Sequence, residues 1–76
     1  MCLAVPAKVT SVHNSCYAVA QTMGVTQKIN IQLINTPLPG EYVLIHAGYA
    51  IEKIDNDRFE FLNEVLQKMI EGQTDA

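Results

Sequence analysis

Alternation between apolar and polar residues marks several short segments along the chain. It is cleanest between Gln27 and Ile34, where Ile29, Ile31 and Leu33 fall on one face. Alternation of this kind is typical of a β-strand with one buried face. Other short segments rich in small and β-prone residues extend the pattern, and the strands predicted in all are 3–12, 16–21, 27–34, 42–46 and 49–54.

Turn-forming residues separate these segments. Residues 13–15 and the pair Met23-Gly24 predict tight turns, and residues 35–40, with two prolines and a glycine, predict a loop. Pro6 has no N–H to donate, so we expect the first strand to lie at a sheet edge or to carry a bulge. Gly48 predicts a bulge or a sharp bend between the last two strands.

The pattern changes after Asp55 to one with helical spacing. Asp57 with Glu60 fits the spacing of a capping box, and Gly72 stands where a helix C′ glycine belongs. These signals predict a helix over about 57–71, followed by a frayed tail at 73–76. The apolar face of this helix holds Leu62, Val65, Leu66, Met69 and Ile70.

The elements together predict a mainly β fold. The 76 residues leave room for one domain, 1–76, with strands over about 2–54. Short strands, regular turns and a glycine bend favour a small closed or partly closed barrel, with the helix covering one face or edge.

The charge pattern argues against two classes of partner. The net charge is −3, and the basic residues are scattered along the chain, whereas nucleic-acid-binding proteins gather theirs into a patch. No apolar run approaches the roughly 20 residues that cross a bilayer, and no secretory signal is recognisable. We therefore expect a cytoplasmic protein that binds neither nucleic acid nor membrane. No catalytic motif is present, so we expect no enzyme activity.

Cys2 is the first candidate for chemistry. If the initiator methionine is removed, the thiol and the free amine of Cys2 can chelate one metal ion, and thiolate suits low-valent iron, copper or zinc. The alternative is a small apolar residue in a frayed terminus, which position alone favours. The second cysteine, Cys16, is expected to be buried, and a Cys2–Cys16 disulfide is disfavoured in a reducing compartment.

His46 is the second candidate. It follows an apolar strand and precedes Ala47-Gly48, where its imidazole can reach out of the core toward a metal. The alternative is a histidine at the core edge that is hydrogen-bonded to backbone. His13 falls in a predicted turn and is expected to be plain surface.

Two segments together resemble a known family. The start, MCLAVPAKV, and residues 40–51, GEYVLIHAGYAI, resemble the two signatures of the HypC/HybG/HupF family of [NiFe]-hydrogenase maturation chaperones. The resemblance extends over nearly the whole chain. The departures are mild: Ala7, Glu41 and Tyr49 stand where family members often have Gly, Asp and Phe.

This resemblance implies an OB-like barrel and a carrier role. Such proteins bind HypD, on which an Fe(CN)2CO fragment is assembled, and deliver that fragment to the hydrogenase large-subunit precursor. HypE is a further expected member of the complex, and no permanently bound cofactor is expected. Carried over to this chain, the metal ligands are Cys2 and His46. The expected partner-binding residues are Cys2, Leu3, Val5, Pro6, Gly48 and Tyr49.

Two other functions remain as alternatives. One is a small acidic OB-like protein that binds nucleic acid, an idea that rests on architecture alone. The other is a thiol adaptor that uses Cys2 and Cys16.

Overall fold

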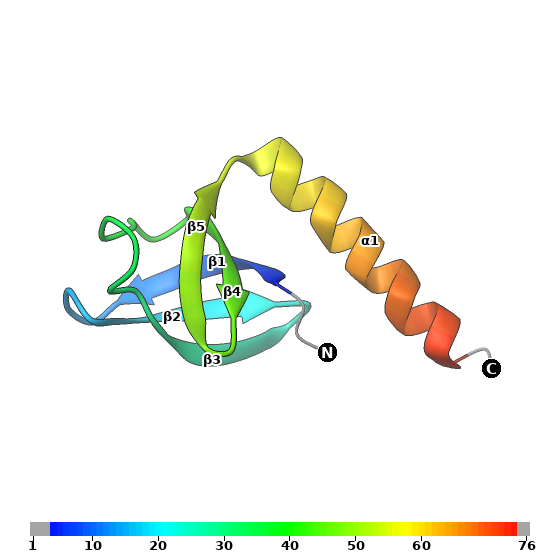
Figure 1. Ribbon diagram of the computed structural model, residues 1–76, viewed down its shortest axis with the longest axis horizontal. Coiled ribbons are helices and arrows are strands. Elements are labelled where there is room, and N and C mark those ends of the chain that lie inside the picture. The colour runs from blue at the N-terminus through cyan, green and yellow to red at the C-terminus, as the bar shows by residue number, and fades with distance from the viewer. Residues whose placement is uncertain (1–3, 75–76) are drawn as a thin grey trace.

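Five strands and one helix make up the fold in the computed structural model, which describes residues 4–74 and their side chains through residue 70. The strands close into a barrel in the spatial order β1-β2-β3-β5-β4 (Figure 1). The predicted mainly β fold, a small five-strand barrel followed by a helix, is confirmed. The elements are β1 (Val5–Val12), β2 (Tyr17–Thr22), β3 (Val25–Asn30), β4 (Tyr42–His46), β5 (Tyr49–Ile54) and α1 (Asn56–Thr74).

The barrel interior combines branched aliphatic side chains with alanines. Small inward-facing residues let the strands of a narrow barrel approach one another, and the larger ones fill the remaining space. Val12 and Ile34 pack against this core from its margin. Its buried members are Ala7, Val9, Ala18, Ala20, Ile29, Ile31, Val43, Ile45 and Ala50.

β1 lies inside the sheet, between β2 and β4. Lys8 is opposite Gln21 of β2, and Val5 is opposite Ile45 of β4. The expected edge position is therefore wrong, whereas the expected bulge is present as a register shift between Val9 and Ser11. Pro6 pairs with Leu44 of β4, and the register with β2 begins two residues later, at Lys8.

β3 ends four residues earlier than its alternating pattern predicts. At Asn30 the side-chain oxygen accepts a 2.8 Å hydrogen bond from the Gln32 backbone N–H, and the Asn30 amide donates to the Gln32 side chain. Such Asx turns compete with strand pairing. The chain consequently leaves the sheet here: Ile31 remains in the core, but Leu33 is 64% exposed.

Asp55 caps helix α1. Its carboxylate accepts a 2.8 Å hydrogen bond from the Arg58 N–H, and its carbonyl accepts from the Phe59 N–H. The capping box expected at Asp57 and Glu60 is therefore wrong, because the capping residue is Asp55, two residues earlier. Gly72 lies within the helix rather than beyond it, and of the predicted tail only residues 75 and 76 lie outside the described part.

Helix α1 packs on β1 and β4 and extends beyond the barrel (Figure 1). The rings of Tyr42 and Phe59 stack with their centroids 4.2 Å apart. Further along, a groove of about 140 Å³ is lined by apolar residues from the start of β1 and from the helix, namely Ala4, Pro6, Leu62, Val65, Leu66 and Met69. Within the described residues, no helix has the length and apolar character needed to span a bilayer.

Candidate functional site

The start of β1 lies between the last residues of β2 and β4. Val5 pairs with Ile45, the neighbour of His46, and the Thr22 hydroxyl donates a 3.0 Å hydrogen bond to the Pro6 carbonyl. The chain that precedes β1 is therefore attached to the barrel beside the end of β4. Cys2 and Leu3, which belong to that preceding chain, lie outside the described residues.

His46 ends β4 and is half-buried. It is opposite Tyr49 across a two-residue turn in which Ala47 and Gly48 have φ values of 53° and 85°. Two positive φ angles are the signature of a type I′ turn, which suits the right-handed twist of a hairpin. The Gly48 carbonyl also accepts a 2.9 Å hydrogen bond from the Asn30 N–H, so the turn beside His46 is tied to β3.

His46 has few potential metal-binding neighbours. Among the residues that the structure describes, no group of three or more His, Cys, Asp or Glu side chains is arranged to hold a metal ion. A resident site of four protein ligands, as in structural zinc sites, therefore has no counterpart there. The roles predicted for Cys2 and His46 as ligands remain predictions.

The predicted partner-binding residues differ in exposure. Tyr49 is 45% exposed and Gly48 is exposed, whereas Val5 is half-buried and Pro6 is buried. Pairing of Val5 with Ile45 and of Tyr49 with His46 gathers these positions at neighbouring points of the sheet. Their contact with a partner is still a prediction.

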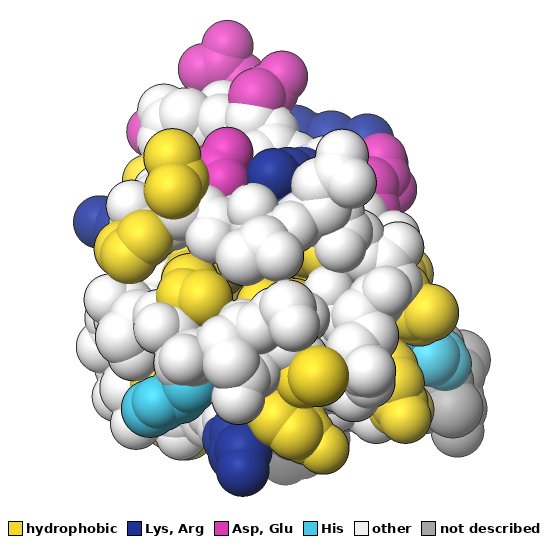
Figure 2. Space-filling view, turned by 90° about the vertical axis from the view of Figure 1, so that its left-hand side faces the viewer, with side chains coloured by type: hydrophobic (Ala, Val, Ile, Leu, Met, Phe, Trp, Pro, Cys, Tyr) yellow, Lys and Arg dark blue, Asp and Glu magenta, His cyan; other side chains and the backbone are white. Residues whose placement is uncertain are grey.

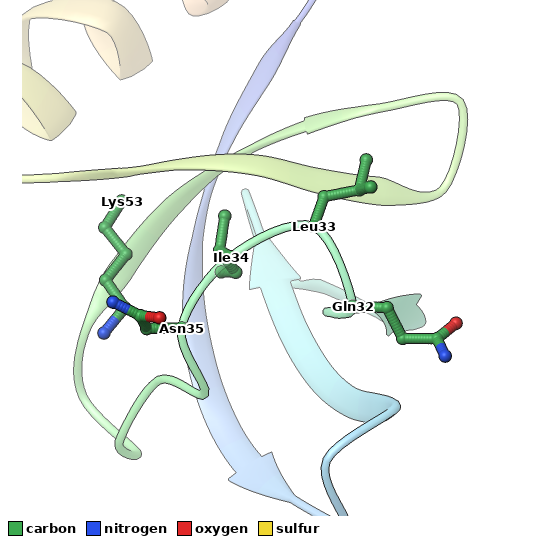
Figure 3. A pocket seen from close by; sticks show the side chains of 5 residues that line it. All are labelled: Gln32, Leu33, Ile34, Asn35 and Lys53. Carbon is green, nitrogen blue, oxygen red and sulfur yellow. The ribbon is translucent and has the colours of Figure 1, made fainter.

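A larger hollow lies elsewhere, between the loop after β3 and β5. It measures about 520 Å³, and of its lining residues only Lys53 carries a charge. In Figure 3, Lys53 and Gln32 lie at opposite sides of the hollow, with Leu33 and Ile34 between them. The hollow offers no pair of acid and base groups, so its size alone does not make it a catalytic site.

The face shown in Figure 2 carries few Lys and Arg side chains, and those near its top lie among Asp and Glu side chains. Lys53, Arg58 and Lys68 each lie within 3.5 Å of a carboxylate, from Glu41, Glu52 and Glu64 respectively. Paired and dispersed cations do not provide the electrostatic surface that phosphate backbones require.

Comparison with known proteins decides the family. A sequence model of the HupF/HypC family matches residues 1–66. The chain belongs to the HupF/HypC family. Residues 1–66 include both segments on which the resemblance was based and every strand of the barrel, and the predicted membership is confirmed.

Curated relatives of the family resemble the chain over most of its length. It is 34% identical to the hydrogenase maturation factor HypC of Helicobacter hepaticus, over 99% of this chain and 93% of the relative. It is 33% identical to the hydrogenase maturation factor HybG of Escherichia coli K12, over 91% and 92%. The hydrogenase expression/formation protein HupF of Rhizobium leguminosarum is 28% identical, over 95% and 72%.

The second cysteine of this HupF/HypC-family chain lies at the other end of β1. The Asn14 side chain accepts hydrogen bonds from the backbone N–H groups of Cys16 and Tyr17, at 2.7 and 2.9 Å. The Cys16 carbonyl accepts from the Ile31 N–H, and the thiol is free and half-buried. Cys16 was predicted to be buried, and the structure leaves it half-buried.

The sequence interpretation did not identify Thr22 and Asn30, which position parts of the site. Asn30 carried a usable signal, because asparagine often ends strands through side-chain hydrogen bonds. Thr22 carried none, since its partner Pro6 is 16 residues away and the contact depends on the barrel register.

Proposed function

We propose that this HupF/HypC-family protein acts in [NiFe]-hydrogenase maturation as a carrier in the cytoplasm, without catalysis of its own. With HypD it holds the Fe(CN)2CO fragment and delivers it to the large-subunit precursor. The observation that carries this proposal is the pairing of Val5 with Ile45, beside His46. Cys2 precedes Val5 by three residues, which span at most about 11 Å, so its thiol can reach the His46 end of the barrel.

The donor set suits a cargo that must be released. A thiolate is a soft ligand appropriate to low-spin iron that already carries cyanide and carbonyl groups. Cys2 supplies this thiolate, and His46 supplies an imidazole nitrogen. Two protein ligands let the fragment leave more readily than a closed set of four would. HypD, HypE and the precursor then complete the surroundings of the iron in turn.

The exposed hairpin beside His46 supports a partner contact at the same place. Tyr49 is large, amphipathic and 45% exposed, and aromatic residues of this kind are enriched at protein interfaces. Gly48 has no side chain, so the turn beside Tyr49 carries only the methyl group of Ala47. Leu3 and Val5 add apolar contacts, so that docking of HypD excludes water from the thiol.

Cysteine substitutions in a strain that lacks the native gene test the proposal. Cys2→Ala is expected to abolish processing of the large subunit, and Cys16→Ala, the matched loss of a thiol, is expected to leave it intact. Infrared spectra of the protein co-purified with HypD should show CO and CN bands for Cys16→Ala but not for Cys2→Ala. Normal processing with a folded Cys2→Ala protein would contradict the proposal.

The thiol-adaptor alternative conflicts with the barrel geometry. β1 separates Val5 from Val12 by roughly 20 Å at about 3.3 Å per residue, and Cys16 lies beyond Val12. Cys2 is within about 11 Å of Val5, whereas a disulfide needs Cα atoms within about 7 Å. An intramolecular disulfide would therefore require the barrel to open. The nucleic-acid alternative lacks a basic surface, as described above.

A further inference from the structure

Strand β5 is fully paired on one side and barely paired on the other. Its pairing with β4 runs the length of the strand, from Tyr49 to Ile54. On the β3 side the described residues supply one bridge, between Asn30 and Tyr49, because β3 ends at Asn30. The barrel is therefore closed beside the β4–β5 turn, and residues 51–54 continue past the end of β3 with a free edge.

The loop after β3 does not fill this gap. Residues 31–41, all of which the structure describes, contain no strand or bridge, and none of their backbone hydrogen bonds joins residues 51–54. Ile31 and Pro37 are buried instead. Between this loop and β5 lies the hollow of about 520 Å³, lined by Lys53 on the strand and by residues 32–35 on the loop (Figure 3). The free edge of β5 therefore borders open space.

The backbone of Lys53 is directed into this space. Hydrogen-bonded and non-hydrogen-bonded pairs alternate along an antiparallel ladder. His46 and Tyr49, which flank a two-residue turn, form a hydrogen-bonded pair. The ladder then passes Ile51, the extra residue of a bulge, and reaches Val43 and Lys53 as a non-hydrogen-bonded pair. The N–H and C=O of Lys53 consequently point away from β4, toward the hollow.

We infer that the free edge of β5 binds an extended, uncharged peptide segment of a partner protein by strand addition. A free strand edge presents N–H and C=O groups that an extended backbone satisfies. Ile51 is 43% exposed on the strand, and Leu33 is 64% exposed on the loop, so aliphatic side chains of the peptide have apolar surface to cover. Lys53 already lies 3.5 Å from the Glu41 carboxylate, so the site does not require an acidic peptide.

The shape of the edge favours a short segment over a second copy of this chain. Residues 51–54 span roughly 13 Å at about 3.3 Å per residue. The bulge at Ile51 increases the local twist, which hinders flat pairing between two sheets. A second copy would also bring its own loop of residues 31–41 toward the same hollow, whereas a single peptide can follow a twisted edge.

This contact goes beyond the proposed function. The free edge runs from the middle of β5 to Ile54, which pairs with Tyr42, whereas His46 lies at the other end of β4. Peptide binding to the free edge therefore requires neither the iron fragment nor the residues proposed to hold it, and it can be measured on the purified full chain.

Two substitutions at Lys53 separate the backbone from the side chain. Lys53→Pro removes the N–H that faces the hollow, and Lys53→Ala is the matched control, because it loses the same ion pair with Glu41 but keeps the N–H. The probe is an acetylated and amidated peptide of alternating threonine and valine, Thr-Val-Thr-Val-Thr-Val, titrated into isotope-labelled protein. Urea midpoints show whether both variants are folded.

Saturable shifts of the amide resonances of Leu33 and of residues 51–54 are expected with the parent and with Lys53→Ala. Lys53→Pro should bind about three- to tenfold more weakly, the loss expected for one hydrogen bond. A second probe, the same peptide N-methylated at its third and fourth residues, repeats the test on unchanged protein and should also bind more weakly.

Three results would overturn the inference. One is the absence of saturable shifts in residues 51–54 at millimolar peptide. Another is equal affinity of the two peptides for the parent, or equal weakening by Lys53→Pro and Lys53→Ala, which would assign the binding to side chains. The third is a shift of these amides with protein concentration, together with a doubled mass in sedimentation, which would assign the edge to a second copy.

Discussion

The two ends of strand β1 differ in how the chain supplies the residues around them. At the first end, β1 begins beside His46, which is 44 residues from Cys2 in sequence. At the second end, His13 and Cys16 are three residues apart in the turn that joins β1 to β2. Barrel closure thus brings the start of β1 beside His46, whereas sequence proximity alone places His13 near Cys16.

Backbone hydrogen bonding separates the two ends further. The N–H of Cys16 donates to Asn14 and its carbonyl accepts from Ile31, which holds this thiol inside a turn. Cys2 precedes the first strand in the sequence and lies outside the described residues. The proposed carrier role requires the Cys2 thiol to pass an iron fragment from one protein to another, and no such role is proposed for Cys16. The content of Cys and His is therefore a poorer guide to the site than the way in which the backbone presents them.

The histidines offer the largest expected effect. His46→Ala is expected to lower processing of the large subunit by about 10- to 100-fold, the usual loss when a metal ligand or a residue that orients one is removed. His13→Ala, at the other end of β1, should process it normally. Immunoblots of precursor and processed subunit measure both. A defect of similar size in the two variants would erase the distinction between the ends.

Two glycines with positive φ allow the effect of a turn on function to be separated from its effect on the free energy of unfolding. Gly48 (φ 85°) lies beside His46, and Gly40 (φ 97°) ends the loop after β3, and a Cβ at either position meets nothing within 4 Å. Valine in the left-handed region costs roughly 1–2 kcal/mol whatever the space, so both substitutions should lower the free energy of unfolding by a similar amount. Urea titration measures this loss.

Only Gly48→Val is expected to reduce large-subunit processing, because its turn holds His46 and Tyr49 in place. Gly40→Val serves as the stability-matched control. If both variants process the subunit equally well, the geometry of the β4–β5 turn is irrelevant to the function.

Local patterns in the sequence predicted the elements better than their ends. The strand segments were recognisable because alternation and turn residues are local features. β3 stops at Asn30 because one side chain competes with the ladder, and α1 begins after Asp55 because that carboxylate faces the free N–H of Arg58. Both element ends depend on local side-chain hydrogen bonds, which the hydrophobic periodicity of the sequence does not predict.

The sequence identified candidate site residues, but it did not predict how the strands that carry them are arranged in space. The resemblance pointed to Cys2 and His46, yet nothing local places the start of β1 beside the end of β4. That proximity follows from the pairing of Val5 with Ile45, which are 40 residues apart in the sequence. Such non-local contacts produce no periodic pattern in a single sequence. Pro6 illustrates the same limit: its missing N–H predicted either an edge strand or a bulge, and only the structure shows that β1 has two neighbouring strands and a bulge between Val9 and Ser11.

The smallest expected effect concerns Glu41, which lies at the opposite end of β4 from His46. Its carboxylate accepts a 2.6 Å hydrogen bond from the Leu38 N–H and lies 3.5 Å from Lys53, and the Leu38 bond is the main cause that lowers the pKa of Glu41 below its ordinary value. A depressed carboxyl pKa means that this stabilisation is complete above the ordinary glutamate pKa and is lost as the pH falls through the folded-state value.

Glu41→Gln should therefore destabilise the protein slightly at neutral pH, and the difference from the parent should shrink on acidification. Urea midpoints between pH 7 and about pH 3, the range in which carboxylates titrate, measure the trend. A difference that stays constant with pH would show that the charge of Glu41 is irrelevant and that only the shape of its side chain matters. Glu41 and His46 lie at opposite ends of β4, so Glu41→Gln should leave large-subunit processing at neutral pH unchanged. A processing defect in this variant would contradict the proposal that the functional residues lie at the end of the barrel where β1 begins.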